Sequence, residues 1–175
     1  MRLGIALGGF SGVGKTTVGR RLAALIDLPF VDTDALLAAV AGPPDTQIAR
    51  DGEPVFRARE RAVIASLPAT PQVIATGGGA WIDPVNRAAL AERAWLVVLS
   101  APLAEIRARV AGEGRWAWSD AVEARFAARA PAYAVADHVV DTAGRDAEEV
   151  AAALASWWRA RPIDRGGRAL GSTGG

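Results

Sequence analysis

The only lysine among 175 residues, Lys15, lies in a glycine-rich segment of a kind that binds phosphate. Residues 9–16 read Gly-Phe-Ser-Gly-Val-Gly-Lys-Thr and match the pattern G-x-x-x-x-G-K-[ST] in full. The other 19 basic residues are arginine, whose planar guanidinium cannot replace a compact ammonium group on a flexible stem. The retention of lysine at this position indicates a working site, and we expect the chain to bind a nucleoside triphosphate.

The roles within this segment follow from the chemistry of phosphate. Backbone N–H groups at a helix N-terminus would surround the β-phosphate, where the helix dipole favours an anion. Lys15 would reach the β- and γ-phosphates, and the Thr16 hydroxyl would ligate Mg²⁺. The expected ATP-binding residues are Gly12, Val13, Gly14, Lys15, Thr16 and Thr17. The alternative is a glycine-rich turn that binds no ligand.

Two carboxylates, Asp32 and Asp34, follow a short apolar run. Asp32 could hold a water of the Mg²⁺ shell, since Mg²⁺ keeps most of its waters. On an extended chain Asp34 would point to the same side as Asp32. It would then orient an attacking hydroxyl, or take its proton. The alternative for Asp34 is an N-cap for a helix that begins at Ala35.

Composition restricts the class of protein. The chain has no cysteine and one histidine, which excludes disulfides, cysteine nucleophiles and sites built on several histidines. The net charge of +1 argues against nucleic acid as the main partner. No signal peptide and no apolar run of about 18 residues is present, so we expect a soluble, cytoplasmic protein without membrane association. We also expect a monomer.

Short apolar runs alternate with helical patterns along the chain. Strands are expected at 3–8, 29–31, 73–75, 95–99 and 138–141, and helices after the glycine loop and at 35–41, 53–67, 84–93, 102–110, 119–129 and 148–158. This alternation predicts a three-layer α/β/α fold with a five-stranded parallel sheet. Ligands bind beyond the carboxyl ends of such strands. Residues 1–160 would form a single domain, and the glycine-rich segment 161–175 a disordered tail.

Three consecutive glycines, 77–79, directly follow an expected strand. Glycine there costs conformational entropy, so its use suggests that the backbone approaches a ligand without a Cβ in the way. A plain tight turn is the alternative. Trp81, just beyond, would either line the pocket or pack in the core.

Five segments, in their order and spacing, resemble the shikimate kinase family. They are 9–16, Asp32-Thr33-Asp34, Gly52-Glu53 with Phe56-Arg57 and Glu60, the glycines 77–79, and Arg129-Ala130-Pro131-Ala132-Tyr133. The resemblance covers residues 3–158 and implies a P-loop NTPase fold with a short lid and substrate-binding helices. It also implies ATP-dependent phosphorylation of the 3-hydroxyl of shikimate, in the route to aromatic amino acids.

The resemblance also implies roles for particular residues. Arg57 and Arg129 would grip the substrate carboxylate, because the planar fork of arginine pairs with a carboxylate at two points. Glu60 would fix the Arg57 rotamer at i,i+3 on one helix. Arg59, Arg61 and Arg125 are expected to be surface charges. The expected substrate-binding set is Asp34, Arg57, Gly78, Gly79 and Arg129.

The expected catalytic residues are Lys15, Asp34 and Arg115, with Arg115 also contacting ATP from the lid. Shikimate kinases typically carry Arg-Pro-Leu-Leu there, whereas this chain has Arg115-Trp116-Ala117-Trp118. Leu36-Leu37 and Ile48 also depart from the family pattern of Ile-Glu and an aromatic residue. Two alternatives stay open: a kinase of another small hydroxylated acid or sugar acid, or a nucleotide-binding module without phosphoryl transfer.

Overall fold

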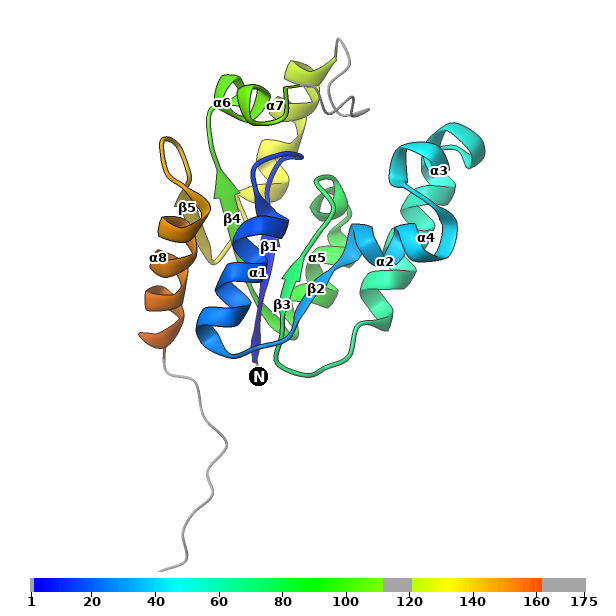
Figure 1. Cartoon of the computed structure of the whole chain (residues 1–175). Helices are drawn as coiled ribbons and strands as arrows, with labels where there is room; N and C mark the ends of the chain where they lie inside the picture. The colour runs from blue at the N-terminus through cyan, green and yellow to red at the C-terminus, as the bar shows by residue number, and fades with distance from the viewer. Residues whose placement is uncertain (1, 112–120, 162–175) are drawn as a thin grey trace, which may run out of the picture.

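A sheet of five parallel strands forms the centre of the molecule, with the order β2-β3-β1-β4-β5 (Figure 1). The computed structural model describes residues 2–111 and 121–161. The strands are β1 (Gly4–Gly8), β2 (Phe30–Asp32), β3 (Val73–Ala75), β4 (Ala94–Ser100) and β5 (His138–Asp141). They agree with the five expected strands to within a residue or two at each end. Strand β1 is central, so the glycine loop that follows it emerges at the middle of the sheet edge.

Helices cover both faces of the sheet and complete three layers, as the sequence predicts (Figure 1). They are α1 (Lys15–Ile26), α2 (Thr33–Ala41), α3 (Pro44–Asp51), α4 (Glu53–Ser66), the 3₁₀ turn η1 (Ala80–Ile82), α5 (Pro84–Ala91), α6 (Leu103–Arg109), α7 (Val122–Tyr133) and α8 (Ala147–Arg159). Helices α1 and α8 pack on one face, and α4, η1 and α5 on the other.

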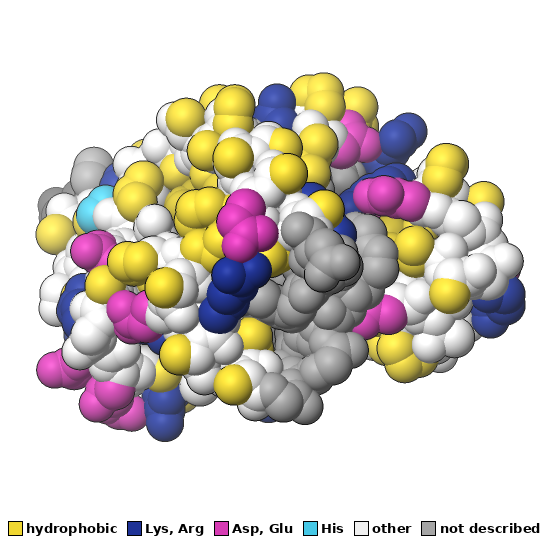
Figure 2. Space-filling model, turned by 90° about the horizontal axis from the view of Figure 1, so that it is seen from above, with side chains coloured by type: hydrophobic (Ala, Val, Ile, Leu, Met, Phe, Trp, Pro, Cys, Tyr) yellow, Lys and Arg dark blue, Asp and Glu magenta, His cyan; other side chains and the backbone are white. Residues whose placement is uncertain are grey.

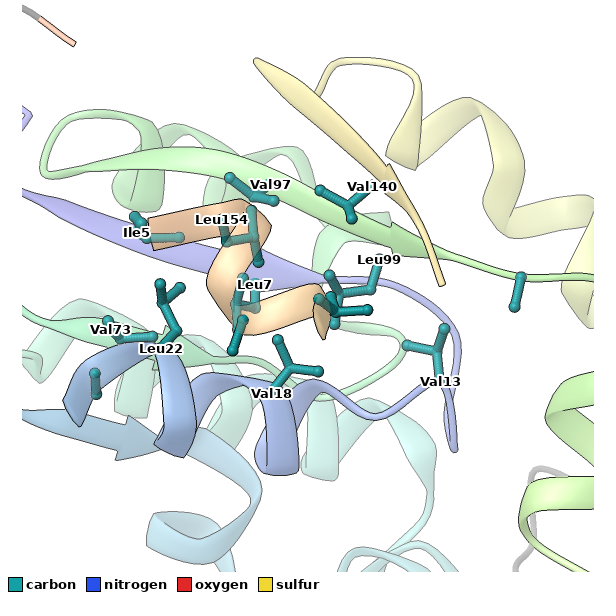
Figure 3. Close-up of a cluster of buried hydrophobic side chains, with 14 of the residues drawn as sticks. Ile5, Leu7, Val13, Val18, Leu22, Val73, Val97, Leu99, Val140 and Leu154 are labelled. Carbon is teal, nitrogen blue, oxygen red and sulfur yellow. The ribbon is translucent and has the colours of Figure 1, made fainter. Parts of the chain in front are cut away.

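The core on the α1/α8 side shows why the strands read as continuous apolar runs. Ile5 and Leu7 of β1 point toward Leu22 of α1 and Leu154 of α8, and all four side chains are buried (Figure 3). The intervening Ala6 belongs to the core on the opposite face. Because both faces are covered, alternate residues of a strand are equally apolar.

Trp81 is a core residue of the opposite face. It is fully buried, and a Cβ on Gly8 would lie 2.6 Å from its indole ring. The ring also packs edge-on against Tyr133, with 6.2 Å between the ring centroids. Trp81 therefore does not line the pocket, and the alternative expectation, a place in the core, is confirmed.

Helix α3 is absent from the sequence-based prediction, because Gly42-Pro43-Pro44 reads as a stop. Pro44 is in fact the first residue of α3, where a missing N–H costs nothing. The helix is fixed by Gln47, which is fully buried and donates to the carbonyls of Gly42 at 2.7 Å and Leu37 at 3.3 Å. The side-chain oxygen of Gln47, Oε1, accepts from Arg59 Nη1 at 3.2 Å. Arg59 therefore joins α3 to α4 and is more than a surface charge.

We expect Gln47→Leu to lower the free energy of unfolding by about 1–3 kcal/mol, because buried polar groups lose their partner. Urea denaturation would measure this. Thr46→Ala, at an exposed neighbour on the same helix, is the control and should leave the midpoint unchanged. Equal midpoints for the two variants would contradict this role of Gln47.

Helix α7 continues beyond its expected end at Arg129 and reaches Tyr133, with Pro131 inside its last turn. The extension puts Arg129 and Tyr133 at i,i+4, on one side of the helix. Both residues belong to the Arg-x-Pro-x-Tyr segment, and both side chains reach the glycines 77–79.

The surface seen from above Figure 1 carries both signs of charge. Figure 2 shows basic and acidic side chains interspersed on this face, outside the grey atoms. Within residues 2–111 and 121–161, no helix has the length and apolar character that a membrane crossing needs.

Candidate active site

The phosphate loop leads directly into α1. Gly14 is the N-cap of this helix and has φ 105°, a left-handed conformation that glycine adopts without strain. Lys15 is 8% exposed, and its Nζ donates to the carbonyls of Gly9 and Phe10, each at 2.9 Å. The ammonium group thus folds back onto the loop that precedes it.

A cavity of about 360 Å³ opens over this loop. Of the residues expected to bind ATP, those from Gly12 to Thr17 all line it. The rest of its lining comprises Ser11, Val18, Asp32, Asp34, Thr76, Gly78, Arg109, Val110, Thr142, Arg145, Asp146, Ala147 and Val150. The structure therefore brings the motif residues together with β2, α6 and the start of α8.

Asp32 lies against the phosphate loop and also begins α2. Its Oδ2 accepts from the Thr16 hydroxyl at 2.7 Å, and its Oδ1 accepts from the backbone N–H groups of Asp34 and Ala35 at 3.0 and 3.2 Å. Asp32 is thus the N-cap of α2, a role that the sequence assigned to Asp34 as the alternative. Asp34 lies within the first helical turn, so the argument from an extended chain is wrong.

Thr16 and Asp32 present a hydroxyl and a carboxylate side by side. These are the hard oxygen donors that Mg²⁺ prefers, and Mg²⁺ is usually held by one or two such groups together with waters and substrate phosphates. The pair fits a magnesium ion at the edge of the phosphate loop.

A second cavity of about 300 Å³ lies beside the first. Its lining is Ser11, Asp34, Pro43, Pro44, Asp45, Ile48, Phe56, Arg57, Glu60, Gly77, Gly78, Gly79 and Arg129. Helices α2, α3 and α4 supply most of these side chains and lie together beside the sheet (Figure 1). Ser11, Asp34 and Gly78 line both cavities, so the two spaces meet there.

Arg57 is held by two glutamates of its own helix. Its Nη1 donates to both Glu60 oxygens, at 3.2 and 3.0 Å, and its Nη2 donates to Glu53 at 2.9 Å. Burial raises the pKa of Glu60, which is 1% exposed, and Arg57 opposes that shift. Burial alone would lower the pKa of Arg57, but Glu60 and Glu53 outweigh it. The expected pairing of Arg57 with Glu60 is confirmed.

Arg129 enters the second cavity from α7. It is 4% exposed, and its Nη1 donates to the Gly78 carbonyl at 3.0 Å. Its guanidinium also stands 4.9 Å from the centre of the Phe10 ring. Burial lowers the pKa of Arg129, and no acidic side chain is among its hydrogen-bond partners in the described residues. An anion in the cavity would complement this buried charge.

The three glycines make room for these side chains. A Cβ on Gly77 would lie 2.7 Å from Asp34 Oδ1, and one on Gly79 would lie 2.7 Å from Arg57 Nη2. A Cβ on Gly78 would lie 2.9 Å from the backbone nitrogen of Ser11. The close approach observed at these glycines is to the site's own residues, and their approach to a ligand stays a prediction.

The motif analysis missed an arginine of the first cavity. Arg109 lines the first cavity and donates to the Val13 carbonyl at 3.2 Å and the Thr142 hydroxyl at 3.0 Å. Arg109 belongs to no motif, so no sequence signal distinguishes it from the other arginines. Arg115, expected to be a catalytic lid residue, lies outside the described residues.

Comparison with known proteins identifies the family to which the chain belongs. The family model described as shikimate kinase matches residues 11–159. A shikimate kinase from Geobacter sulfurreducens is 40% identical over 163 residues, which cover 89% of this chain and 90% of the relative. One from Symbiobacterium thermophilum is 41% identical over 163 residues, 87% of this chain and 94% of the relative.

A solved structure gives the same result. Shikimate kinase from Acinetobacter baumannii, in complex with shikimate, superposes with a TM-score of 0.81 at 30% identity, over 93% of this chain and 96% of that one. Fold, motif order and relatives agree, and the chain belongs to the shikimate kinase family, the ATP-dependent kinases that phosphorylate shikimate.

Proposed function

We propose that this chain transfers the γ-phosphoryl group of ATP to the 3-hydroxyl of shikimate across the junction of its two cavities. The observation that carries the proposal is the position of Asp34, which lines both the cavity over the phosphate loop and the cavity that holds Arg57 and Arg129. A carboxylate at that junction can meet an acceptor hydroxyl on one side and the phosphate chain on the other.

The nucleotide would occupy the first cavity. Backbone N–H groups within the range Gly12 to Thr16 would surround the β-phosphate, and Lys15 would contact the β- and γ-phosphates. The positive charge of Mg²⁺, when the ion is bound beside Thr16 and Asp32, would offset the negative charge of the phosphates. The Thr16 hydroxyl and a water held by Asp32 would coordinate it.

The acid would occupy the second cavity, with its carboxylate between the guanidinium groups of Arg57 and Arg129. Asp34 would accept a hydrogen bond from the reacting hydroxyl and orient it, or take its proton. Backbone N–H groups of Gly78 and Gly79 would contact the substrate. Arg115 would reach the phosphates from the lid and stabilise the charge that develops during transfer.

The proposal includes a monomer with a single kinase domain over residues 1–160, in which one continuous sheet and its helices form both cavities. ATP as co-substrate fits an enzyme of the cytoplasm. The mixed charges of the described surface fit a protein whose partners are small molecules and not nucleic acid.

Replacing either Arg57 or Arg129 with alanine is expected to raise the KM for shikimate at least about tenfold, because a charge-assisted hydrogen bond is lost in a partly desolvated pocket. The KM for ATP should change little, since neither side chain lines the first cavity. Steady-state kinetics of both variants and the wild type would measure this.

The methyl ester of shikimate tests whether the carboxylate is what the arginines recognise. The ester has no charge for them to bind, so both alanine variants should treat it as the wild type does. Arg61→Ala, at an exposed arginine of α4 outside both cavities, is the control and should leave every constant unchanged. Equal effects on acid and ester would remove carboxylate recognition from the proposal.

A further inference from the structure

Residues 77–79 are all glycine, so no side chain of their own restricts the backbone conformation. All three of its carbonyls are hydrogen-bonded. Those of Gly77 and Gly79 accept from the backbone N–H groups of Ala80 at 3.0 Å and Ile82 at 3.1 Å. The Gly78 carbonyl accepts two side-chain donors, Tyr133 Oη at 2.6 Å and Arg129 Nη1 at 3.0 Å.

Among the N–H groups of this segment, only that of Gly77 has a hydrogen-bond acceptor within the described residues. The Gly77 N–H donates to the Thr33 hydroxyl at 3.2 Å. Those of Gly78 and Gly79 donate to nothing within the described part of the chain, although both residues line the second cavity. Two backbone donors are thus available at the wall of the cavity.

The direction of the Gly79 N–H follows from the Gly78 carbonyl. The two groups belong to one planar peptide, and the described chain has no cis bond, so they point in opposite directions. Two donors occupy both lone pairs of the carbonyl and fix the plane of the peptide. Because the carbonyl points to α7, the Gly79 N–H points away from α7.

We propose that Tyr133 is a positioning residue, which with Arg129 fixes the Gly78–Gly79 peptide so that the Gly79 N–H donates to an oxygen of the bound acid. The inference rests on the proposed function, because it needs a hydroxylated acid in the second cavity. It assigns to Tyr133 an effect on substrate binding without direct contact with the substrate.

The surroundings of Tyr133 suit this task. Burial raises the pKa of its phenol to about 12, so the hydroxyl stays protonated and can donate a hydrogen bond at neutral pH. The ring is braced edge-on by the fully buried Trp81. Arg129 is also proposed to bind the substrate carboxylate, whereas the Tyr133 hydroxyl donates to the Gly78 carbonyl, interacts with the Arg129 guanidinium and is not part of the lining of either cavity.

The test is Tyr133→Phe, which removes the hydroxyl and keeps the ring against Trp81. We expect the KM for shikimate to rise about five- to twentyfold, in line with one lost hydrogen bond, and the KM for ATP to stay within about twofold. Ser66→Ala is the matched control: it also removes a hydroxyl that donates to a backbone carbonyl, at 2.9 Å, but far from both cavities. It should change neither constant.

A second measurement uses the fact that Tyr133 is the only tyrosine in the sequence. Tyrosine labelled with ¹³C at the ζ position gives a single resonance, which should move when wild-type enzyme is saturated with shikimate. No movement on saturation would overturn the proposal, even if the variant failed to fold.

The two proposals fail in different ways. An unchanged KM for shikimate in Tyr133→Phe, with an active wild type, would overturn the positioning role alone. A wild type that leaves shikimate unphosphorylated would overturn the proposed function and with it this inference.

Discussion

Lys15→Met is expected to slow phosphoryl transfer roughly a thousandfold or more, with the fold intact. Lys15 supplies the compact positive charge of the phosphate loop, and fixed charges directed at a transferring phosphoryl group account for effects of this size. Methionine keeps the length and apolar stem of the side chain and removes only the ammonium group. The loss should therefore appear in turnover more than in folding.

The measurement is turnover of shikimate by coupled ADP release, accompanied by urea denaturation. Denaturation is needed because the ammonium also donates to the carbonyls of Gly9 and Phe10, and methionine leaves both without that donor. Lys15→Arg should also be slow, since a guanidinium is planar and bulkier. A Met variant that retains a tenth of wild-type turnover would remove Lys15 from the catalytic machinery.

The sheet was the easiest part to predict from the sequence. Apolar runs such as Ala94–Ser100 are covered on both faces, so their composition alone identifies buried parallel strands. The phosphate loop was equally clear, because glycine spacing and a single lysine define it locally. In both cases the determining forces act within a few residues of chain.

Helix α3 shows where local information ends. Pro43 and Pro44 read as a stop, and no apolar stripe follows them. The helix forms because Gln47 satisfies the carbonyls of Leu37 and Gly42 and receives Arg59 from α4. These hydrogen bonds link α3 to other parts of the fold, and no sequence pattern within the segment predicts them.

The site shows the same division. Asp34, Arg57 and Arg129 could be chosen from motifs, and the structure places all three on one cavity. The geometry of Asp34 could not be derived, because whether the chain is extended or helical at that point depends on Asp32 acting as the N-cap. The role of the glycines likewise needed the packing, since the atoms that fill the missing Cβ positions come from other elements.

Asp34→Asn is expected to lower the turnover of shikimate by about a hundred- to ten-thousandfold, the range for a positioned acid–base group. Asparagine has the same shape, so the packing against Gly77 is kept, where a Cβ would lie 2.7 Å from Asp34 Oδ1. The negative charge is lost, and with it the ability to accept the proton of the reacting hydroxyl. Affinity for ATP should change only a few-fold, because in the proposed complex the loop and Lys15 hold the phosphates.

Two measurements separate these effects: turnover by coupled ADP release, and ATP binding by calorimetry. Asp45→Asn is the matched control, because Asp45 is an acidic residue that lines the second cavity but not the first. It should keep most of the wild-type turnover, since a carboxylate away from the junction cannot reach both reactants. If ATP binding collapsed together with turnover in Asp34→Asn, Asp34 would belong to the nucleotide site. The acceptor hydroxyl would then need another residue to orient it, and Glu60 would be the next carboxylate to test. Burial raises the pKa of Glu60, and the nearby Asp34 carboxylate raises it further.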